Sequence, residues 1–166
     1  YQLGHRKIGY IGSDSTMMFS SDRRTGYENA LLRHQIPLNS TYCIEMKSAN
    51  EEDRQPLLEL LKRPDRPTAL VVSDDILAVA LERVCLEIGL SIPDDLSIIS
   101  FNNSLFARLT SPQLTSVDIN SFQLGIESAS QMINHIENPN LLATKILVPH
   151  HIVERDSCAS PKAVNP

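Results

Sequence analysis

The sequence alternates repeatedly between a short apolar run and a longer segment with the apolar periodicity of a helix. The apolar runs occupy residues 7–12, 41–46, 68–72 and 96–101. Helices are expected near residues 22–35, around 57–61 and over 76–88, with Gly89 ending the last of them. This alternation predicts an α/β fold, in which a parallel sheet with right-handed crossovers carries helices on both faces. The run at 68–72 is apolar throughout, which is typical of a central strand.

Local signals predict where several elements begin and end. Residues 20–22 (Ser-Ser-Asp) are good N-caps for the first helix. Asn50 and Asp53 resemble a capping box ahead of the second helix, and Pro56 is expected to delay its start.

The pattern changes after Pro112. A short strand is expected at 114–117 and a helix over 121–137. One or two closing strands are expected within 145–156, and the polar tail at 157–166 is expected to fray.

Composition and charge narrow the class of protein. The chain has 166 residues, 42% of them apolar, which is typical of one globular domain with its own core. Its net charge is -5, and its aromatic residues are four Tyr and four Phe. The chain therefore lacks the basic surface and the aromatic stacking positions that are typical of nucleic-acid binding. Three widely spaced cysteines argue against a disulfide framework and favour the cytoplasm. No membrane span or signal peptide is visible, and because the chain starts at Tyr1 without Met, we expect it to be part of a longer protein.

Polar side chains follow the expected strands where each strand ends. In an open parallel sheet, ligands bind outside the carboxyl ends of the strands. The segments at that edge are 13–22, 47–50, 73–75 and 102–105. They carry hydroxyls, amides, two carboxylates and the pair Arg23 and Arg24. This inventory suits a neutral, hydroxyl-rich ligand such as a sugar.

The sequence leaves one catalytic alternative open. Asp74 and Asp75 follow the central strand directly and could hold Mg²⁺ for phosphoryl transfer, although a helix N-cap and its neighbour are the simpler interpretation. Nucleotide-binding and nucleophile-elbow motifs are missing. His150 and His151 would point to opposite faces of a strand, so they predict no shared metal. We therefore expect no catalytic residue, no cofactor and no metal.

Six short stretches follow one another in an order that carries more information than any one of them. LGHRKIGYIG at 3–12 resembles the pattern lGHrrIg.i.G, and residues 23–31 resemble R..Gy..AL. ALVVSDDILAVAL at 69–81 resembles a.v..nD.mA.ga, and GLSIPDDLSIISFNN at 89–103 resembles G..vP.DvsviGfDn. SPQLTSV at 111–117 and VERDS at 153–157 resemble P.LTtv and the terminal..R.S. Together they resemble the core domain of the lac repressor and galactose repressor (LacI/GalR) family of transcriptional regulators.

The resemblance implies a fold of the type I periplasmic-binding-protein kind, with two α/β lobes that hold an effector between them. Residues 1–166 would then be a partial effector-binding domain. Its second lobe would span 7–117, the helix at 121–137 would cross over to the first lobe, and 145–156 would return as closing strands. The DNA-binding helix-turn-helix and most of the first lobe lie outside this sequence.

The resemblance also implies roles for individual residues. Arg23 stands at the position of the family's arginine that hydrogen-bonds the ligand, and Ser73 stands at a position that often reaches the ligand. Asp74 matches the helix-capping aspartate, which has a supporting role. Asn102 replaces the usual ligand-binding aspartate, and an amide donates as well as accepts hydrogen bonds. Ser48 falls near a position where some members stack an aromatic ring on the sugar.

The function implied is that of an effector-sensing domain of a DNA-binding repressor. Its partners would be a sugar, a second copy of the chain and operator DNA, the last through the absent helix-turn-helix, with no membrane involved. The combination SFNN followed by SLFARLTSP resembles the maltose-operon repressors, which favours maltose or a related glucoside. Leu105, Phe106, Leu109 and the helix starting at Ile76 are the expected dimer face. The alternative is a sugar-binding protein of a transport system, which shares the fold.

Overall fold

One mostly parallel sheet organises the chain. The computed structural model describes residues 1–14, 16–46 and 51–162. The strands of this part are β1 (Ile8–Gly12), β2 (Cys43–Glu45), β3 (Ala69–Val72), β4 (Ser97–Phe101), β5 (Thr115–Asp118) and β6 (His151–Val153). They form one sheet in the order β2-β1-β3-β4-β5-β6, in which only β6 is antiparallel to its neighbour. The expected parallel α/β sheet is confirmed.

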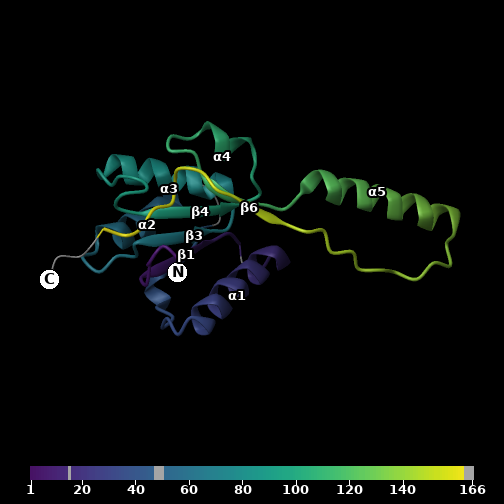
Figure 1. Cartoon of the computed structure of the whole chain (residues 1–166), viewed down its shortest axis with the longest axis horizontal. Helices are drawn as coiled ribbons and strands as arrows, with labels where there is room; N and C mark the ends of the chain where they lie inside the picture. The colour runs from purple at the N-terminus through teal and green to yellow at the C-terminus, as the bar shows by residue number, and fades with distance from the viewer. Residues whose placement is uncertain (15, 47–50, 163–166) are drawn as a thin grey trace.

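Helices cover both faces of this sheet. They are α1 (Met18–Arg33), α2 (Glu51–Lys62), α3 (Asp75–Glu87), α4 (Leu105–Leu109) and α5 (Ser121–Glu137), with a 3-10 turn at Ser40–Tyr42. Figure 1 shows α1 on one side of the sheet and α3 and α4 on the other. Successive strand residues serve opposite faces, as pleating requires. Tyr10 packs with Tyr27 of α1, whereas Ile11 joins the larger core of α2 and α3.

Two helices begin earlier than local signals predict. Helix α1 begins at Met18, so the expected N-caps at 20–22 lie inside it, and the Ser20 hydroxyl donates to the Ser13 carbonyl over 3.0 Å instead. Helix α2 begins at Glu51 with Pro56 inside it, so the expected delay is wrong. The lost backbone hydrogen bond is offset because three leucines of this helix are at most 3% exposed. The expected capping box lies outside the described residues, because Asn50 is one of its two members.

The expected fraying of the tail is wrong for its first half. Ser157 is fully buried: its hydroxyl accepts from the Thr115 amide over 2.8 Å and donates to the Ile98 carbonyl over 2.6 Å. Ala159 and the Ser97 hydroxyl exchange two hydrogen bonds of 3.0 Å. Polarity alone indicated a solvated tail. These polar groups are instead satisfied by backbone and side-chain partners on β4 and β5, which local sequence does not reveal.

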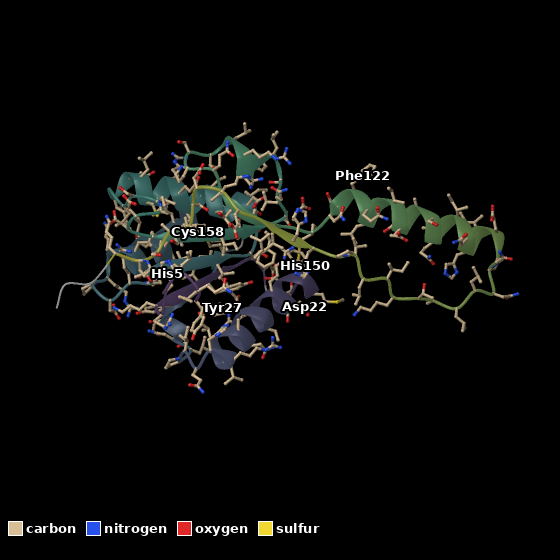
Figure 2. The ribbon with its side chains drawn as sticks, viewed as in Figure 1. His5, Asp22, Tyr27, Phe122, His150 and Cys158 are labelled. Atoms are coloured by element: carbon tan, nitrogen blue, oxygen red, sulfur yellow. The ribbon has the colours of Figure 1, made fainter. Side chains whose placement is uncertain are left out.

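His5 fastens the amino-terminal segment to this tail. Its Nε2 donates to the Ala159 carbonyl and its Nδ1 bonds the Thr68 hydroxyl, both over 2.8 Å, and the ring is only 4% exposed. Figure 2 shows His5 and Cys158 on the body of the domain. Burial lowers the pKa of His5 below 6.5.

Stability is therefore expected to fall as the pH drops below about 6.5. Below this pH the unfolded chain binds a proton on His5, whereas the folded chain does so only at lower pH because its His5 pKa is lower. The stabilisation by neutral His5 is therefore complete above the pKa of the unfolded chain and is lost as the pH falls through the pKa of the folded chain. His5→Gln can still donate to the Ala159 carbonyl but does not titrate. Melting curves from pH 8 to pH 5 should show a shallower decline in the free energy of unfolding for His5→Gln than for the unaltered protein. Parallel declines for both proteins would contradict this role.

Helix α5 and the segment that follows it extend away from the sheet (Figure 1). None of the residues of α5 is buried, and Phe122 at its start is 80% exposed (Figure 2). Of the closing strands expected within 145–156, one is found, β6. The assignment of 121–137 to a first lobe stays a prediction. No helix in the described part of the chain is both long and apolar enough to cross a membrane.

Candidate ligand site at the carboxyl ends of the strands

A cavity lies where the central strands end. Strands β1, β3 and β4 are neighbours and run in the same direction, so the residues that follow them meet at one edge of the sheet. The cavity there has a volume of about 510 Å³. Its lining residues are Ser13, Phe19, Met46, Asp74, Asp75, Ile76, Leu77, Asn102, Ser104 and Phe106. Three of the four expected segments therefore converge as predicted, while 47–50, including Ser48, lies outside the described residues.

Arg23 joins the ends of β3 and β4 to α1. Its Nη2 donates to Asn102 Oδ1 over 3.0 Å, and its Nη1 donates to the Ser73 carbonyl. The guanidinium carbon lies 4.7 Å from the ring centre of Phe101 and 5.1 Å from that of Phe19, in range of a cation-π contact. Burial lowers the pKa of Arg23, opposed by Tyr10 and the nearby aspartates, and an arginine in this setting keeps its charge. The guanidinium thus supports Asn102, a residue of the cavity wall, and bonds the Ser73 carbonyl just after β3.

Asp74 caps α3, as the resemblance implies, and also lines the cavity, whereas Ser73 does not line it. The cap is a hydrogen bond that Asp74 accepts from the Leu77 amide over 2.9 Å. The Ser73 side chain is fully buried, does not line the cavity, and its hydroxyl has no hydrogen-bond partner among the described residues. Ser73 contributes its carbonyl to Arg23 and supports the site.

Asn102 follows β4 with a φ of +97°, a left-handed backbone that asparagine tolerates better than most residues. Its side-chain oxygen accepts from Arg23, and its backbone amide donates to the Val117 carbonyl over 2.9 Å. An aspartate at this position would accept from Arg23 in the same way. The amide differs in also carrying two donors.

Asp75 is a buried anchor beneath the cavity. It is 1% exposed, and one of its oxygens accepts from the hydroxyls of Ser100 over 2.5 Å and Ser116 over 2.8 Å. The other oxygen accepts from the Ser104 amide over 2.6 Å. This explains the serine at position 100, where the LacI/GalR pattern has glycine. A Mg²⁺ ion would have to displace these three donors. The described residues contain no group of three His, Cys, Asp or Glu side chains that could hold a metal.

Arg155, in the stretch VERDS at 153–157, supports the same edge of the sheet. Arg155 donates to Asn103 Oδ1 and to the Leu114 carbonyl, each over 2.5 Å. The Asn103 amide group in turn donates to Asp118 over 2.8 Å. Arg155 therefore fixes the residue next to Asn102 from a segment more than fifty positions away in sequence.

Phe19 is the site residue that sequence reasoning missed. It lines the cavity, is 45% exposed and lies beside the Arg23 guanidinium. The segment 13–22 was expected to be a loop, so no side chain in it other than polar ones was singled out. The sequence signal that could have identified Phe19 is an aromatic residue four positions before Arg23. A half-exposed ring beside polar side chains is a surface on which the apolar face of a sugar can stack.

Charge also limits what the cavity can hold. Two carboxylates, Asp74 and Asp75, face one guanidinium, Arg23, which leaves these residues with one formal negative charge. An anionic ligand would meet that charge in a half-buried setting. A neutral ligand with hydroxyl groups would meet an acceptor in Asp74, donors in Asn102 and an aromatic ring in Phe19.

Comparison with known proteins agrees with this geometry. The sequence profile of the family described as "Periplasmic binding protein-like domain" matches residues 1–158. The chain is similar to the arabinose metabolism transcriptional repressor of Geobacillus stearothermophilus, 35% identical over 142 residues, covering 82% of this chain and 38% of that protein. It is similar to the ribose operon repressor of Haemophilus influenzae, 32% identical over 159 residues, covering 96% of this chain and 48% of that protein.

A solved structure shows the same fold. A LacI transcriptional regulator from Bacillus cereus subsp. cytotoxis NVH 391-98 has a TM-score of 0.89 and 34% identity, covering 96% of this chain and 56% of that one. The chain spans less than half the length of the two repressors above. These relatives are regulators of transcription and not enzymes, so the catalytic alternative is not supported. The chain belongs to the periplasmic binding protein-like family, in the group formed by the effector-binding domains of LacI-family transcriptional regulators.

Proposed function

We propose that this chain senses a neutral sugar as part of a DNA-binding transcriptional repressor that works in the cytoplasm. The observation that carries the proposal is the cavity at the carboxyl ends of the strands, where Asp74, Asn102 and Phe19 meet beside Arg23. A fixed acceptor, an amide and an aromatic ring are the groups that recognise a sugar's hydroxyls and its apolar face. The names of the arabinose and ribose repressors support the same class of effector.

Maltose or a related glucoside is the preferred effector within that class. This choice rests on the stretch from Ser100 to Pro112, which resembles the maltose-operon repressors. Operator DNA would be bound by a helix-turn-helix outside this sequence. Helix α5, with its exposed apolar side chains, would pack against the first lobe, which would supply the other wall of the cleft.

The repressor is proposed to act as a homodimer that uses the face formed by α3 and α4. Ile76, Leu105, Phe106 and Leu109 on this face are 54%, 67%, 47% and 70% exposed. Ile76 and Phe106 also line a groove of about 210 Å³ between α2 and α3. Arg83 and Glu87 pair over 3.5 Å at its edge. An apolar centre with both charges on its rim can match a second copy of itself.

Thermal melting of the full-length protein tests the proposal. Maltose, arabinose, ribose, the anionic sugar glucuronate and Mg²⁺ form separate arms. At 100 times its Kd, a ligand that binds only the folded state adds about 2.7 kcal/mol to the free energy of unfolding, which raises the melting temperature by several degrees. We expect such a rise with one neutral sugar. A rise with Mg²⁺ and with none of the sugars would instead favour the phosphoryl-transfer alternative.

Asp74→Asn should weaken sugar binding by about tenfold while leaving the fold intact. Asparagine keeps the oxygen that caps α3, and it is as good an N-cap as aspartate. It replaces the charged acceptor that lines the cavity, and a hydrogen bond to a charged group is about twice as strong as a neutral one. Calorimetric titration with the sugar from the melting panel measures the change. Unaltered affinity would remove Asp74 from the site.

A transport protein of the same fold would also bind sugar. The discriminating measurement is therefore DNA binding by the full-length protein. A gel-shift assay with the DNA upstream of its own gene should show a complex whose stability changes with the sugar. A full-length protein that binds sugar but no DNA would favour the transport alternative.

A further inference from the structure

The ligand cavity and the groove on the proposed dimer face share one wall. Met46, Ile76 and Phe106 line both depressions. Met46 is 1% exposed and its amide donates to the Gly12 carbonyl over 2.9 Å, so it is fixed in the core. Ile76 and Phe106 are about half exposed, each with one side toward the cavity and the other toward the groove.

The backbone that carries these two side chains is held rigidly. Ile76 lies in the first turn of α3 and Phe106 in the first turn of α4. Asp75 ties the two helix starts together, because it begins α3 and accepts from the amide of Ser104, the N-cap of α4. Asp75 thus joins the two helix starts, while the apolar side chains of Ile76 and Phe106 project from them about half exposed.

We propose that Ile76 and Phe106 couple occupancy of the ligand cavity to association of two copies of the chain. The inference rests on the proposed function, because it takes a sugar for the cavity and a second copy for the groove. A sugar that packs against the cavity side of these side chains restricts their rotation. The second copy then associates with side chains that are already ordered, so the entropy cost of ordering them is met once rather than twice. The coupling is positive: the sugar strengthens the dimer.

The expected size is a fall of about fivefold or more in the dimer dissociation constant at saturating sugar, the lower end of measured coupling between sites. Linkage requires the reciprocal effect, so sugar must bind the dimer more tightly than the monomer by the same factor. Sedimentation velocity of the full-length protein over a dilution series, with and without the sugar that gives the largest rise in the melting panel, measures the first quantity. Calorimetric titration above and below the dimer dissociation constant measures the second.

Two variants on α4 distinguish the coupling through the shared wall from a general contribution of this helix to dimerisation. Phe106→Leu keeps an apolar contact in the groove but no longer fills the cavity wall, so the sugar effect on dimerisation should shrink toward onefold. Leu109→Ala lies on the same short helix, is 70% exposed and does not line the cavity. It should weaken the dimer while the fold-change caused by sugar stays as in the unaltered protein.

The outcomes distinguish this inference from the proposed function. If no sugar raises the melting temperature, the proposed function fails and the coupling fails with it. If sugar binds but the dimer dissociation constant is the same with and without it, only the coupling is overturned. An equal sugar effect in Phe106→Leu and in the unaltered protein would overturn the role of the shared wall, as would a protein that stays monomeric at every concentration.

Discussion

Asp75→Ala is expected to lower the free energy of unfolding by about 3 to 5 kcal/mol, the largest stability effect of any single change at this site. The carboxylate is buried and accepts from Ser100, Ser116 and the Ser104 amide. Alanine would leave those three donors without an acceptor in the interior, where each unsatisfied group costs about 1 to 3 kcal/mol. Urea unfolding of the full-length protein, followed by circular dichroism, measures the loss.

The neighbouring aspartate provides a matched control. Asp74→Ala removes the cap of α3 and should cost about 1 kcal/mol. Asp75→Asn keeps one acceptor oxygen but sets an amide nitrogen against one or two of the three donors, so its cost should lie between the two alanine variants. An Asp75→Ala protein no less stable than Asp74→Ala would show that the hydrogen bonds to Asp75 do not hold the strand ends together.

Arg23→Ala is expected to weaken sugar binding about 100-fold, equivalent to ~2.7 kcal/mol of binding free energy. Two effects contribute. The variant loses the guanidinium donors that could reach a ligand, and it releases Asn102, whose oxygen accepts from Arg23 over 3.0 Å. The rise in melting temperature produced by sugar should then disappear at concentrations that saturate the unaltered protein. Each variant is compared with its own sugar-free melting temperature, which separates binding from stability.

Arg24 is the matched control for charge and position. It pairs with Glu28 over 3.0 Å and Glu45 over 3.4 Å and is partly exposed, whereas the bonds to Ser73 and Asn102 are made by Arg23. Exposed pairs of this kind contribute at most about 1 kcal/mol to stability. Arg24→Ala should keep the full response to sugar. Arg23→Lys keeps the charge but not the planar fork, and it should behave like Arg23→Ala. A full response in Arg23→Ala would remove this arginine from the site.

Local sequence was sufficient for the order of elements. The uninterrupted apolar residues at 68–72 predicted a central strand, and β3 lies between β1 and β4. The apolar stripe of α3 and its closing glycine were equally clear, and Gly89 has the expected positive φ of +75°. These signals need no partner elsewhere in the chain, because periodicity and backbone freedom are properties of the segment itself.

Sequence reasoning failed where a residue's role depends on a distant partner. The tail looked solvated because it is polar, but Ser157 is buried by bonds to Ile98 and Thr115. Phe19 was overlooked because its helix begins at Met18, four residues before the expected start at 22.

The sequence by itself determined that this chain is a parallel α/β domain with polar residues at the carboxyl ends of its strands. The alternation of strands and helices, and the residues that follow each strand, can be read from local sequence. Only the tertiary structure decided which of the two adjacent aspartates is buried. Asp75 is buried because Ser100 and Ser116, on two strands distant in sequence, supply its donors, and Asp74 remains half-buried at the cavity wall. Burial of a charge requires such partners, and their positions exist only after the sheet has formed.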